Sequence, residues 1–262
     1  MTAPLLDIVD LSLHYGDTRI LDRVNLRVSA GETVGLVGES GSGKSSTVRA
    51  ALRLLPPNAR LEGTVRIGGR EVLAADAREL RGIRSTEVGF IQQDPRGALN
   101  PVRRIGDSLT ERLVLVHGVG RAEAKRRGLE LLEAVGISRP ELRFRQYPHE
   151  LSGGMLQRVV IAAALTTEPK LLLADEATSA LDVTTQAEVL AILRDLQRER
   201  GLGVLFITHD LHLAAAYCDR VSVMLRGEIV EELDGADLFT GATEPYTKSL
   251  LEAVPTIREA RA

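Results

Sequence analysis

Apolar runs and amphipathic stretches alternate along the second half of the chain. Residues 171–175 and 204–208 are short and mostly apolar, which predicts two buried strands. Between them, residues 183–200 place Val189, Leu193 and Leu196 on one face, as expected of an amphipathic helix. Buried strands that alternate with helices predict a parallel sheet covered by helices, with ligands bound where the strands end.

The first half of the chain changes character at about Asp94. Alternating apolar and polar positions predict an antiparallel, β-rich region with strands at residues 6–15, 24–28, 61–67 and 71–72. A further strand is expected at residues 88–93, after which prolines at 95 and 101 interrupt regular structure. Helical periodicity follows at residues 105–116 and 121–135, and Gly136 stands where a helix C-terminal cap is expected.

Residues 38–45 have the sequence Gly-Glu-Ser-Gly-Ser-Gly-Lys-Ser, the G-x-x-x-x-G-K-S spacing of a phosphate-binding P-loop. A predicted strand precedes the loop and a predicted helix follows it, which is the context that the pattern needs. The glycines let successive N–H groups turn toward phosphate oxygens. Lys44 is expected to reach the β- and γ-phosphates, and Ser45 to hold Mg²⁺. A glycine-rich turn with a chance lysine would not explain the flanking strand and helix.

Two acidic residues, Asp175 and Glu176, end the first apolar run. A carboxylate at the end of such a strand can bind Mg²⁺ directly or through water. Glu176 lies one residue further out, where a general base could meet an attacking water. Taken alone, the pair is better explained as an ordinary acidic strand end. Together with the P-loop, it predicts an ATPase.

A second anion-binding element is predicted far along the chain from the P-loop. Ser152-Gly153-Gly154 opens an apolar helical stretch at residues 155–165, so exposed N–H groups and the Ser152 hydroxyl can meet a phosphate. One nucleotide reaches both elements most simply if it lies between two chains. The tripeptide alone is equally compatible with a simple helix cap.

Composition narrows the classes of function. A net charge of −3 and an aromatic content of 3% without tryptophan offer neither a basic field nor a base-stacking platform, so no nucleic-acid partner is expected. The single cysteine, Cys218, excludes an internal disulfide and a four-cysteine metal site. The apolar runs are shorter than the ~18 residues of a membrane span, and the first residues do not resemble a signal peptide. Any membrane role is therefore expected to come through a partner.

The order of the motifs resembles the nucleotide-binding subunit of ABC transporters over nearly the whole chain. Residues 38–45 look like the Walker A loop, residues 151–157 like the ABC signature, and residues 171–176 like Walker B with its catalytic glutamate. Four further positions fit the family's order. They are the Q-loop glutamine Gln93 (with Gln92 adjacent), the D-loop at residues 179–182, the switch-histidine segment at residues 208–210, and Tyr15, where an aromatic ring stacks on adenine.

The resemblance implies an α/β fold forming one nucleotide-binding domain over residues 1–262. A P-loop NTPase (RecA-like) core with an antiparallel β subdomain is expected at residues 1–93 and 152–238. An inserted α-helical subdomain is expected at residues 94–151, and a C-terminal tail at residues 239–262.

The resemblance also implies ATP and Mg²⁺ as cofactors, and it assigns roles to individual residues. The implied catalytic residues are Lys44, Gln93, Glu176 and His209. The implied ATP contacts are Tyr15, Gly38, Glu39, Ser40, Gly41, Ser42, Gly43, Lys44, Ser45, Ser46, Ser152, Gly153, Gly154, Gln157 and Asp182. The implied Mg²⁺ ligands are Ser45, Gln93 and Asp175.

A head-to-tail dimer with two ATP molecules at its interface follows from the same resemblance. Each ATP would lie between the Walker motifs of one chain and Ser152 and Gly154 of the other. The expected partners are membrane-spanning permease subunits, a second ATP-binding subunit that is identical or paralogous, and, indirectly, an extracytoplasmic solute-binding protein. The expected location is peripheral, on the cytoplasmic side of the cell (inner) membrane.

Two segments narrow the branch of the family. Residues 93–101 and 244–255 are similar to segments of the oligopeptide, dipeptide and nickel importers. The chain lacks the cysteine-rich extension of many peptide importers, which resembles the nickel- or opine-type members. The two segments make di- or oligopeptides the expected cargo, and the missing extension makes nickel or an opine-type metal chelate the alternative. One departure concerns Ala177, which stands where the family usually has proline, so Glu176 is expected to be held less rigidly.

Two alternative functions belong to other classes of protein. A soluble ABC ATPase not coupled to transport would usually carry two cassettes or a long coiled-coil insert, and neither is visible in the sequence. A P-loop kinase that phosphorylates a small molecule is disfavoured by the Ser152-Gly153-Gly154 element in combination with His209.

Overall fold

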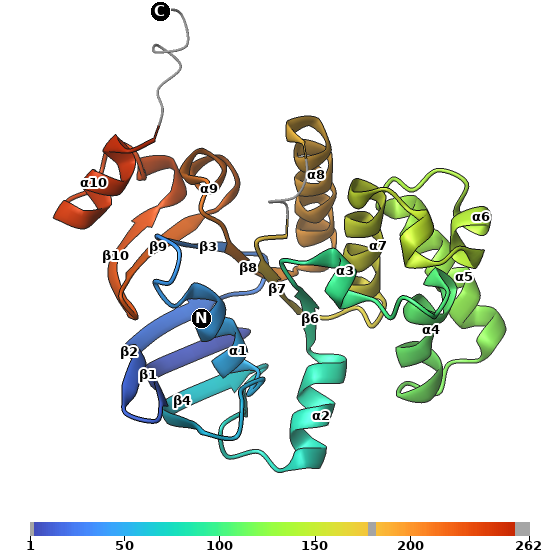
Figure 1. Cartoon of the computed structure of the whole chain (residues 1–262), viewed down its shortest axis with the longest axis horizontal. Helices are drawn as coiled ribbons and strands as arrows, with labels where there is room; N and C mark the ends of the chain where they lie inside the picture. The colour runs from blue at the N-terminus through green and yellow to red at the C-terminus, as the bar shows by residue number, and fades with distance from the viewer. Residues whose placement is uncertain (1–2, 178–181, 255–262) are drawn as a thin grey trace, which may run out of the picture. The chain divides into compact units, whose positions relative to one another are not determined.

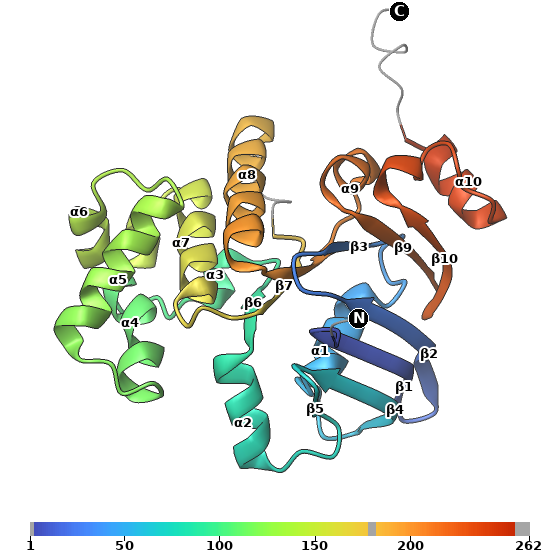
Figure 2. The ribbon, with the colours of Figure 1, turned by 180° about the vertical axis from the view of Figure 1, so that it is seen from behind.

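The computed structural model describes residues 3–177 and 182–254, which fall into two compact units. The first unit comprises Met1–Ala74 and Leu205–Ala262, and the second comprises Ala75–Val204. Figures 1 and 2 show their elements from opposite sides. The subdomain limits expected at residues 94 and 151 stay a prediction.

An antiparallel sheet of four strands lies in the first unit, in the order β2-β1-β4-β5. The strands are β1 (Leu6–Tyr15), β2 (Thr18–Val28), β4 (Ala59–Ile67) and β5 (Arg70–Glu71). The predicted β-rich, antiparallel opening is thereby confirmed. The alternation expected along β1 fails in its middle, because the register with β2 shifts there and Leu11, Ser12 and Leu13 are all buried.

The first unit also contains four neighbouring strands in the order β10-β9-β3-β8, and the P-loop follows β3. They are β3 (Thr33–Val37), β8 (Gly203–Ile207, divided by the unit boundary), β9 (Arg220–Leu225) and β10 (Glu228–Asp234). β3 pairs in parallel with β9 and is buried along its whole length, whereas β9 and β10 form an antiparallel hairpin. The helices of this unit are α1 (Lys44–Ala51), α9 (Leu211–Tyr217) and α10 (Pro245–Glu252), with a 3₁₀ turn at Gly235–Asp237.

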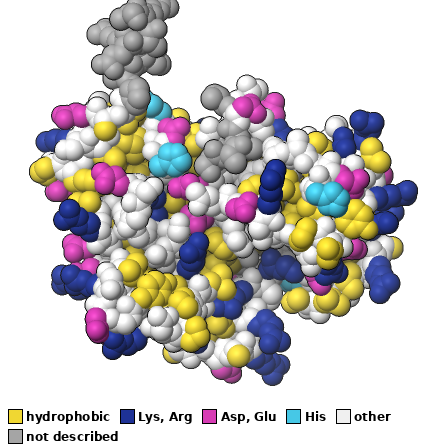
Figure 3. All heavy atoms as spheres, in the orientation of Figure 1, with side chains coloured by type: hydrophobic (Ala, Val, Ile, Leu, Met, Phe, Trp, Pro, Cys, Tyr) yellow, Lys and Arg dark blue, Asp and Glu magenta, His cyan; other side chains and the backbone are white. Residues whose placement is uncertain are grey.

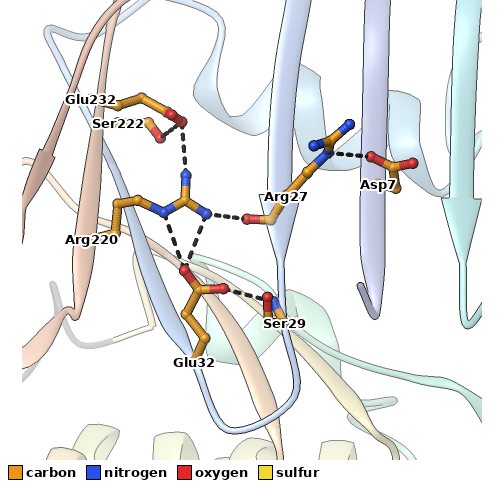
Figure 4. Close-up of polar contacts among 7 residues, drawn as sticks. All are labelled: Asp7, Arg27, Ser29, Glu32, Arg220, Ser222 and Glu232. Atoms are coloured by element: carbon orange, nitrogen blue, oxygen red, sulfur yellow. Dashed lines mark hydrogen bonds and ion pairs between the residues drawn. The ribbon is translucent and has the colours of Figure 1, made fainter. Parts of the chain in front are cut away.

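Arg220, at the start of β9, ties the turn before β3 to its neighbours (Figure 4). Its guanidinium contacts Glu32 Oε1 at 3.1 Å and Glu232 Oε1 at 2.9 Å, and it donates to the Arg27 carbonyl at 2.7 Å. Glu32 also accepts the Ser29 N–H at 2.7 Å. A planar guanidinium that serves three acceptors fixes their relative positions. The strand that leads into the P-loop therefore starts from a rigid turn.

The second unit combines two parallel strands with most of the helices. β6 (Val88–Ile91) and β7 (Leu171–Asp175) pair from Val88 and Leu171 onward. Its helices are α2 (Ala77–Thr86), α3 (Pro95–Ala98), α4 (Ile105–Leu115), α5 (Arg121–Ala134), α6 (Pro140–Arg145), α7 (Gly153–Leu165) and α8 (Val183–Arg200), with a 3₁₀ turn at Pro148–Glu150. No helix among the described residues has both the length and the apolar character needed to cross a bilayer. On the face drawn in Figure 3, acidic and basic side chains are interspersed.

Close packing holds α4, α5 and α6 together around Phe144. A Cβ atom on Gly106 of α4 would lie 2.1 Å from the Phe144 ring, so only glycine lets the ring approach that helix. Gly136 follows α5 with φ +74°, which confirms the cap expected there. α2 was not predicted, because only Leu80 and Ile83 are buried along it and its apolar stripe is thin.

The start of α10 is fixed by Glu231 of β10. Glu231 Oε1 accepts the Thr243 N–H at 2.6 Å, the Thr243 hydroxyl at 2.7 Å and the Glu244 N–H at 3.1 Å. Burial by itself raises the pKa of the Glu231 carboxyl. The Thr247 hydroxyl and the donors of Thr243 and Glu244 lower the pKa by more than burial raises it, so the net pKa is about 2. The ionised carboxylate is therefore the form that holds the segment.

This contact predicts a pH dependence of stability. A carboxyl whose pKa is depressed by folding stabilises the folded chain above its ordinary pKa of 4.5, and that contribution is lost as the pH falls from there toward 2. The free energy of unfolding should therefore exceed that of Glu231→Gln near neutral pH, and the difference should shrink below pH 4.5. Urea titrations across this range measure it. Glu228→Gln, at an exposed position of the same strand, should show no such trend.

Candidate nucleotide site

Glycines at both ends of the P-loop allow its backbone to pass between neighbouring elements. Gly38 has φ +146°, and a Cβ there would lie 2.2 Å from the Met224 carbonyl oxygen. Gly43, the residue before α1, has φ +112°, and a Cβ there would lie 2.9 Å from Leu21 Cδ2. Larger residues would meet both strain and a clash at these points. The sequence pattern is thus explained by local packing as well as by phosphate chemistry.

Hydrogen bonds within the first unit hold the loop in shape. The Gly227 N–H donates to the Ser42 carbonyl at 2.8 Å, and the Ser42 N–H donates to the Glu39 carbonyl at 3.2 Å. The Lys44 ammonium, only 6% exposed, donates to the carbonyls of Gly38 and Glu39 at 2.7 and 2.8 Å. These carbonyls fix the cation at the loop, where it can meet phosphate oxygens.

Other predicted residues of the first unit lie around this loop or at its sheet edge. Ser40 and Gly41 are exposed at its tip, and Ser45 and Ser46 are half-buried in the first turn of α1. The Thr208 N–H donates to the Leu36 carbonyl at 3.4 Å, which places exposed His209 at the strand edge that carries the P-loop. Tyr15 is half-buried at the end of β1.

In the second unit, the structure brings Gln93 and Glu176 together. The Gln93 side-chain amide donates to Glu176 Oε2 at 2.7 Å. Asp175 ends β7 and is 3% exposed. Glu176 follows it with φ +48°, a left-handed conformation that is uncommon for a residue with a side chain. Asp175 is thus a buried strand residue, whereas Glu176 is half-buried in the sharp turn that follows.

Residues 151–154 form an exposed helix N-terminus. Ser152 is the N-cap of α7, and its hydroxyl accepts the Met155 N–H at 3.4 Å. Ser152 and Gly153 are exposed, and a Cβ on Gly153 would meet nothing within 4 Å. The serine caps the helix, as one of the two alternatives expects. Anion binding at this helix end stays a prediction.

Gln157 and Asp182 make internal contacts in this structure. The Gln157 side chain is 1% exposed, and its amide donates to the Ala177 carbonyl, next to Glu176. Asp182 caps α8 by accepting the Thr185 N–H at 3.0 Å and the Thr185 hydroxyl at 2.7 Å, and these bonds lower the pKa of its carboxyl. The rest of the predicted D-loop, residues 179–181, lies outside the described residues. The direct ATP contacts expected of Gln157 and Asp182 stay predictions.

The donor set agrees with a magnesium ion held mainly by phosphate and water. Mg²⁺ prefers oxygen ligands and usually takes only one or two from protein. In the first unit, Ser45 offers a hydroxyl oxygen in the first turn of α1. In the second unit, Asp175 offers a carboxylate at the end of β7. Each by itself is the kind of ligand that Mg²⁺ takes. The described residues contain no cluster of three or more histidine, cysteine or acidic side chains suited to a metal held by protein alone.

Comparisons with known proteins identify the family of this chain. Residues 21–179 match the family described as ABC transporter. The chain is 47% identical to the probable peptide ABC transporter ATP-binding protein y4tR of Sinorhizobium fredii, over 98% of the chain and 78% of that relative. It is 44% identical to the oligopeptide transport ATP-binding protein OppD of Bacillus subtilis, over 97% of the chain and 72% of that relative.

Solved structures show the same fold. CbiO1 from Clostridium perfringens, part of the ABC transporter complex cbiONQ, superposes with a TM-score of 0.79 at 26% identity, over 91% of each chain. MJ0796, a bacterial ABC transporter cassette solved as a dimer, gives 0.78 at 30% identity, over 87% of this chain and 98% of that one. MJ0796 was also solved in a post-hydrolysis state bound to ADP and Pi.

The chain therefore belongs to the ABC transporter family. It is an ATP-binding cassette, an ATPase with the α/β fold of P-loop NTPases, which confirms the predicted fold class and enzyme class.

Sequence reasoning missed two contacts of this site. Tyr246 of α10 accepts the Glu39 N–H at 3.2 Å, although the two residues are 207 positions apart. The second is the hydrogen bond from Gln157 to the Ala177 carbonyl, whereas Gln157 was expected to contact ATP. Neither contact has a local signal in the sequence, because each depends on how distant segments pack.

Proposed function

We propose that this chain is the ATP-hydrolysing subunit of an importer for di- or oligopeptides. The observation that carries the proposal is the identity of 43–47% to ATP-binding proteins of peptide and oligopeptide transporters over nearly the whole chain. The site residues described above support it, because each motif needed for nucleotide chemistry is present.

We assign Lys44 and the loop N–H groups to the phosphates of ATP. The Lys44 ammonium is already fixed near the loop backbone, so little of its freedom is lost when phosphate binds. Tyr15 would stack on the adenine ring, and Ser45 and Asp175 would hold Mg²⁺. When bound, Mg²⁺ would neutralise charge on the phosphate oxygens.

Glu176 acts as the general base that takes a proton from the attacking water. The amide of Gln93, which donates to its carboxylate, orients the base, and His209 contacts the γ-phosphate. Ser152 and Gly154 close the site from a facing chain, identical or paralogous. ATP binding then draws two chains together, and hydrolysis lets them part.

A groove in the second unit fits the expected docking of a membrane-spanning partner. A cavity of about 360 Å³ opens between β6, α3, α4 and α7, next to the Gln93 segment. Its lining mixes apolar residues such as Phe90 and Leu99 with the charged Arg103 and Glu111. A short amphipathic helix of a permease would find both kinds of partner there, and its movement would reach Gln93 through the adjacent Gln92, which lines the cavity. Bound to such a partner, the chain would lie at the cytoplasmic side of the cell membrane.

Uptake by intact cells tests the proposed cargo. Deleting the gene for this chain is expected to abolish uptake of labelled dipeptides or of labelled oligopeptides, and the wild-type gene is expected to restore it. A gene carrying Glu176→Gln should not restore it, because transport requires hydrolysis. Loss of labelled nickel uptake instead would support the alternative cargo. If peptide and nickel uptake both persist, the importer proposal is wrong.

A further inference from the structure

The peptide group between Gly38 and Glu39 is held at both of its polar ends. Its carbonyl, that of Gly38, accepts the Lys44 ammonium at 2.7 Å. Its N–H, that of Glu39, donates to the hydroxyl of Tyr246 at 3.2 Å. Donating its N–H to an acceptor polarises a peptide group and makes its carbonyl a better acceptor. The Tyr246 hydroxyl and the Lys44 ammonium are thus coupled through one peptide group.

Tyr246 is itself placed by a rigid connection. It follows Pro245, the first residue of α10, and the preceding Thr243 and Glu244 are held on β10 by Glu231. Thr247, the next residue, is 1% exposed, so the first turn of α10 is packed against the unit. The hydroxyl therefore meets the P-loop from a fixed position, not from a free tail.

We propose that Tyr246 is a positioning residue for ATP binding, which acts by fixing the Gly38–Glu39 peptide and, through it, the Lys44 ammonium. The Gly38–Glu39 peptide is the first of the loop, so its orientation affects the direction in which the following N–H groups point. A loop fixed before the nucleotide arrives loses less conformational freedom on binding, so the nucleotide binds more tightly. The inference rests on the assignment of residues 38–45 to the phosphates.

Tyr246→Phe tests the proposal, because it removes only the hydroxyl. In the purified full chain, the KM and Kd for ATP with Mg²⁺ should rise by about 3- to 10-fold, the range expected for one lost hydrogen bond. The kcat should stay close to that of the wild type, since Glu176 is untouched. The matched control is Tyr147→Phe, which removes a hydroxyl in the second unit, and its KM should not change.

A purely structural role would give a different result. It would lower the urea midpoint of unfolding and leave the affinity of the folded fraction unchanged, which would overturn the proposal. A lower kcat with unchanged KM would overturn it as well. If wild-type chain fails to bind ATP, or if Lys44→Ala binds ATP as tightly as wild type, the assignment of the P-loop is wrong instead.

A second variant tests the connection from β10. Glu231→Ala removes the acceptor for Thr243 and Glu244 without touching the P-loop, and it should raise the KM for ATP by a factor similar to that of Tyr246→Phe. Glu228→Ala, on the same strand and exposed, is its control. The double variant Glu231→Ala with Tyr246→Phe should be no worse than the more affected single variant, because both act through one contact. Additive effects would contradict the proposal.

Discussion

Replacing Glu176 with glutamine is expected to lower ATP hydrolysis by about 100- to 10,000-fold while ATP still binds. Glutamine has nearly the same shape as glutamate but cannot take a proton from water. The hydrogen bond with Gln93 can persist in the variant, because a glutamine side chain also offers an acceptor oxygen. Release of phosphate measures hydrolysis, and calorimetric titration with ATP measures binding.

The chain offers a matched control for this variant. Glu168 is a second glutamate in the left-handed region, with φ +50°, and it is exposed outside the site. Glu168→Gln should hydrolyse ATP like the wild type. Undiminished turnover by Glu176→Gln would show that the base lies elsewhere. A loss of ATP binding in that variant would show that Glu176 holds the nucleotide and not the water.

Introducing a negative charge at Ser152 is expected to lower hydrolysis by about 100-fold or more. Two like charges near 4 Å repel by several kcal/mol at a protein surface, so Ser152→Asp should keep the phosphate of a facing chain away. Aspartate is as good a helix cap as serine, so α7 should remain intact. Binding of ATP by a single chain should be spared, because Ser152 serves the nucleotide of the other chain.

Ser152→Asn separates charge from capping. Asparagine also caps a helix but is neutral, so its hydrolysis should fall far less than that of Ser152→Asp. Dimer formation with ATP in the Glu176→Gln background, measured by light scattering, should fail with aspartate and survive with asparagine. Equal behaviour of the two variants would mean that Ser152 never approaches a phosphate.

Local patterns predicted the strands and helices that carry their own signal. The run at residues 171–175 became β7, the amphipathic stretch became α8, and the P-loop spacing placed α1 within one residue. The glycine expected to end a helix was also placed correctly, since Gly136 follows α5 with a positive φ. In each case the physical cause is confined to a few neighbouring residues.

Elements without a strong local signal were missed. α2, α3, α6 and α9 were not predicted. Helix α6 buries no residue and α2 buries only two, and α3 lies in the stretch where prolines were wrongly expected to interrupt regular structure. The capping box of α2, in which Asp76 and Glu79 exchange hydrogen bonds with each other's backbone, was the available signal. The bulges of β1 were not predicted either, because they depend on how β1 pairs with β2 and β4.

The site was predicted as a set of motifs but not as a set of contacts. The sequence expectation that Ala177 leaves Glu176 loosely held did not include the bonds made by Gln93 and Gln157. These bonds join residues that are far apart in the chain, so they depend on the fold and not on spacing.

The left-handed turn at Glu176 makes the position of its carboxylate depend on residues distant in the sequence. Such a conformation costs a residue with a side chain about 1–3 kcal/mol, so the backbone at Glu176 is strained. The Gln93 and Gln157 contacts on either side hold it in place. If either contact were lost, the turn could relax and the Glu176 carboxylate would shift. The position of that carboxylate thus depends on two amide side chains outside its own strand.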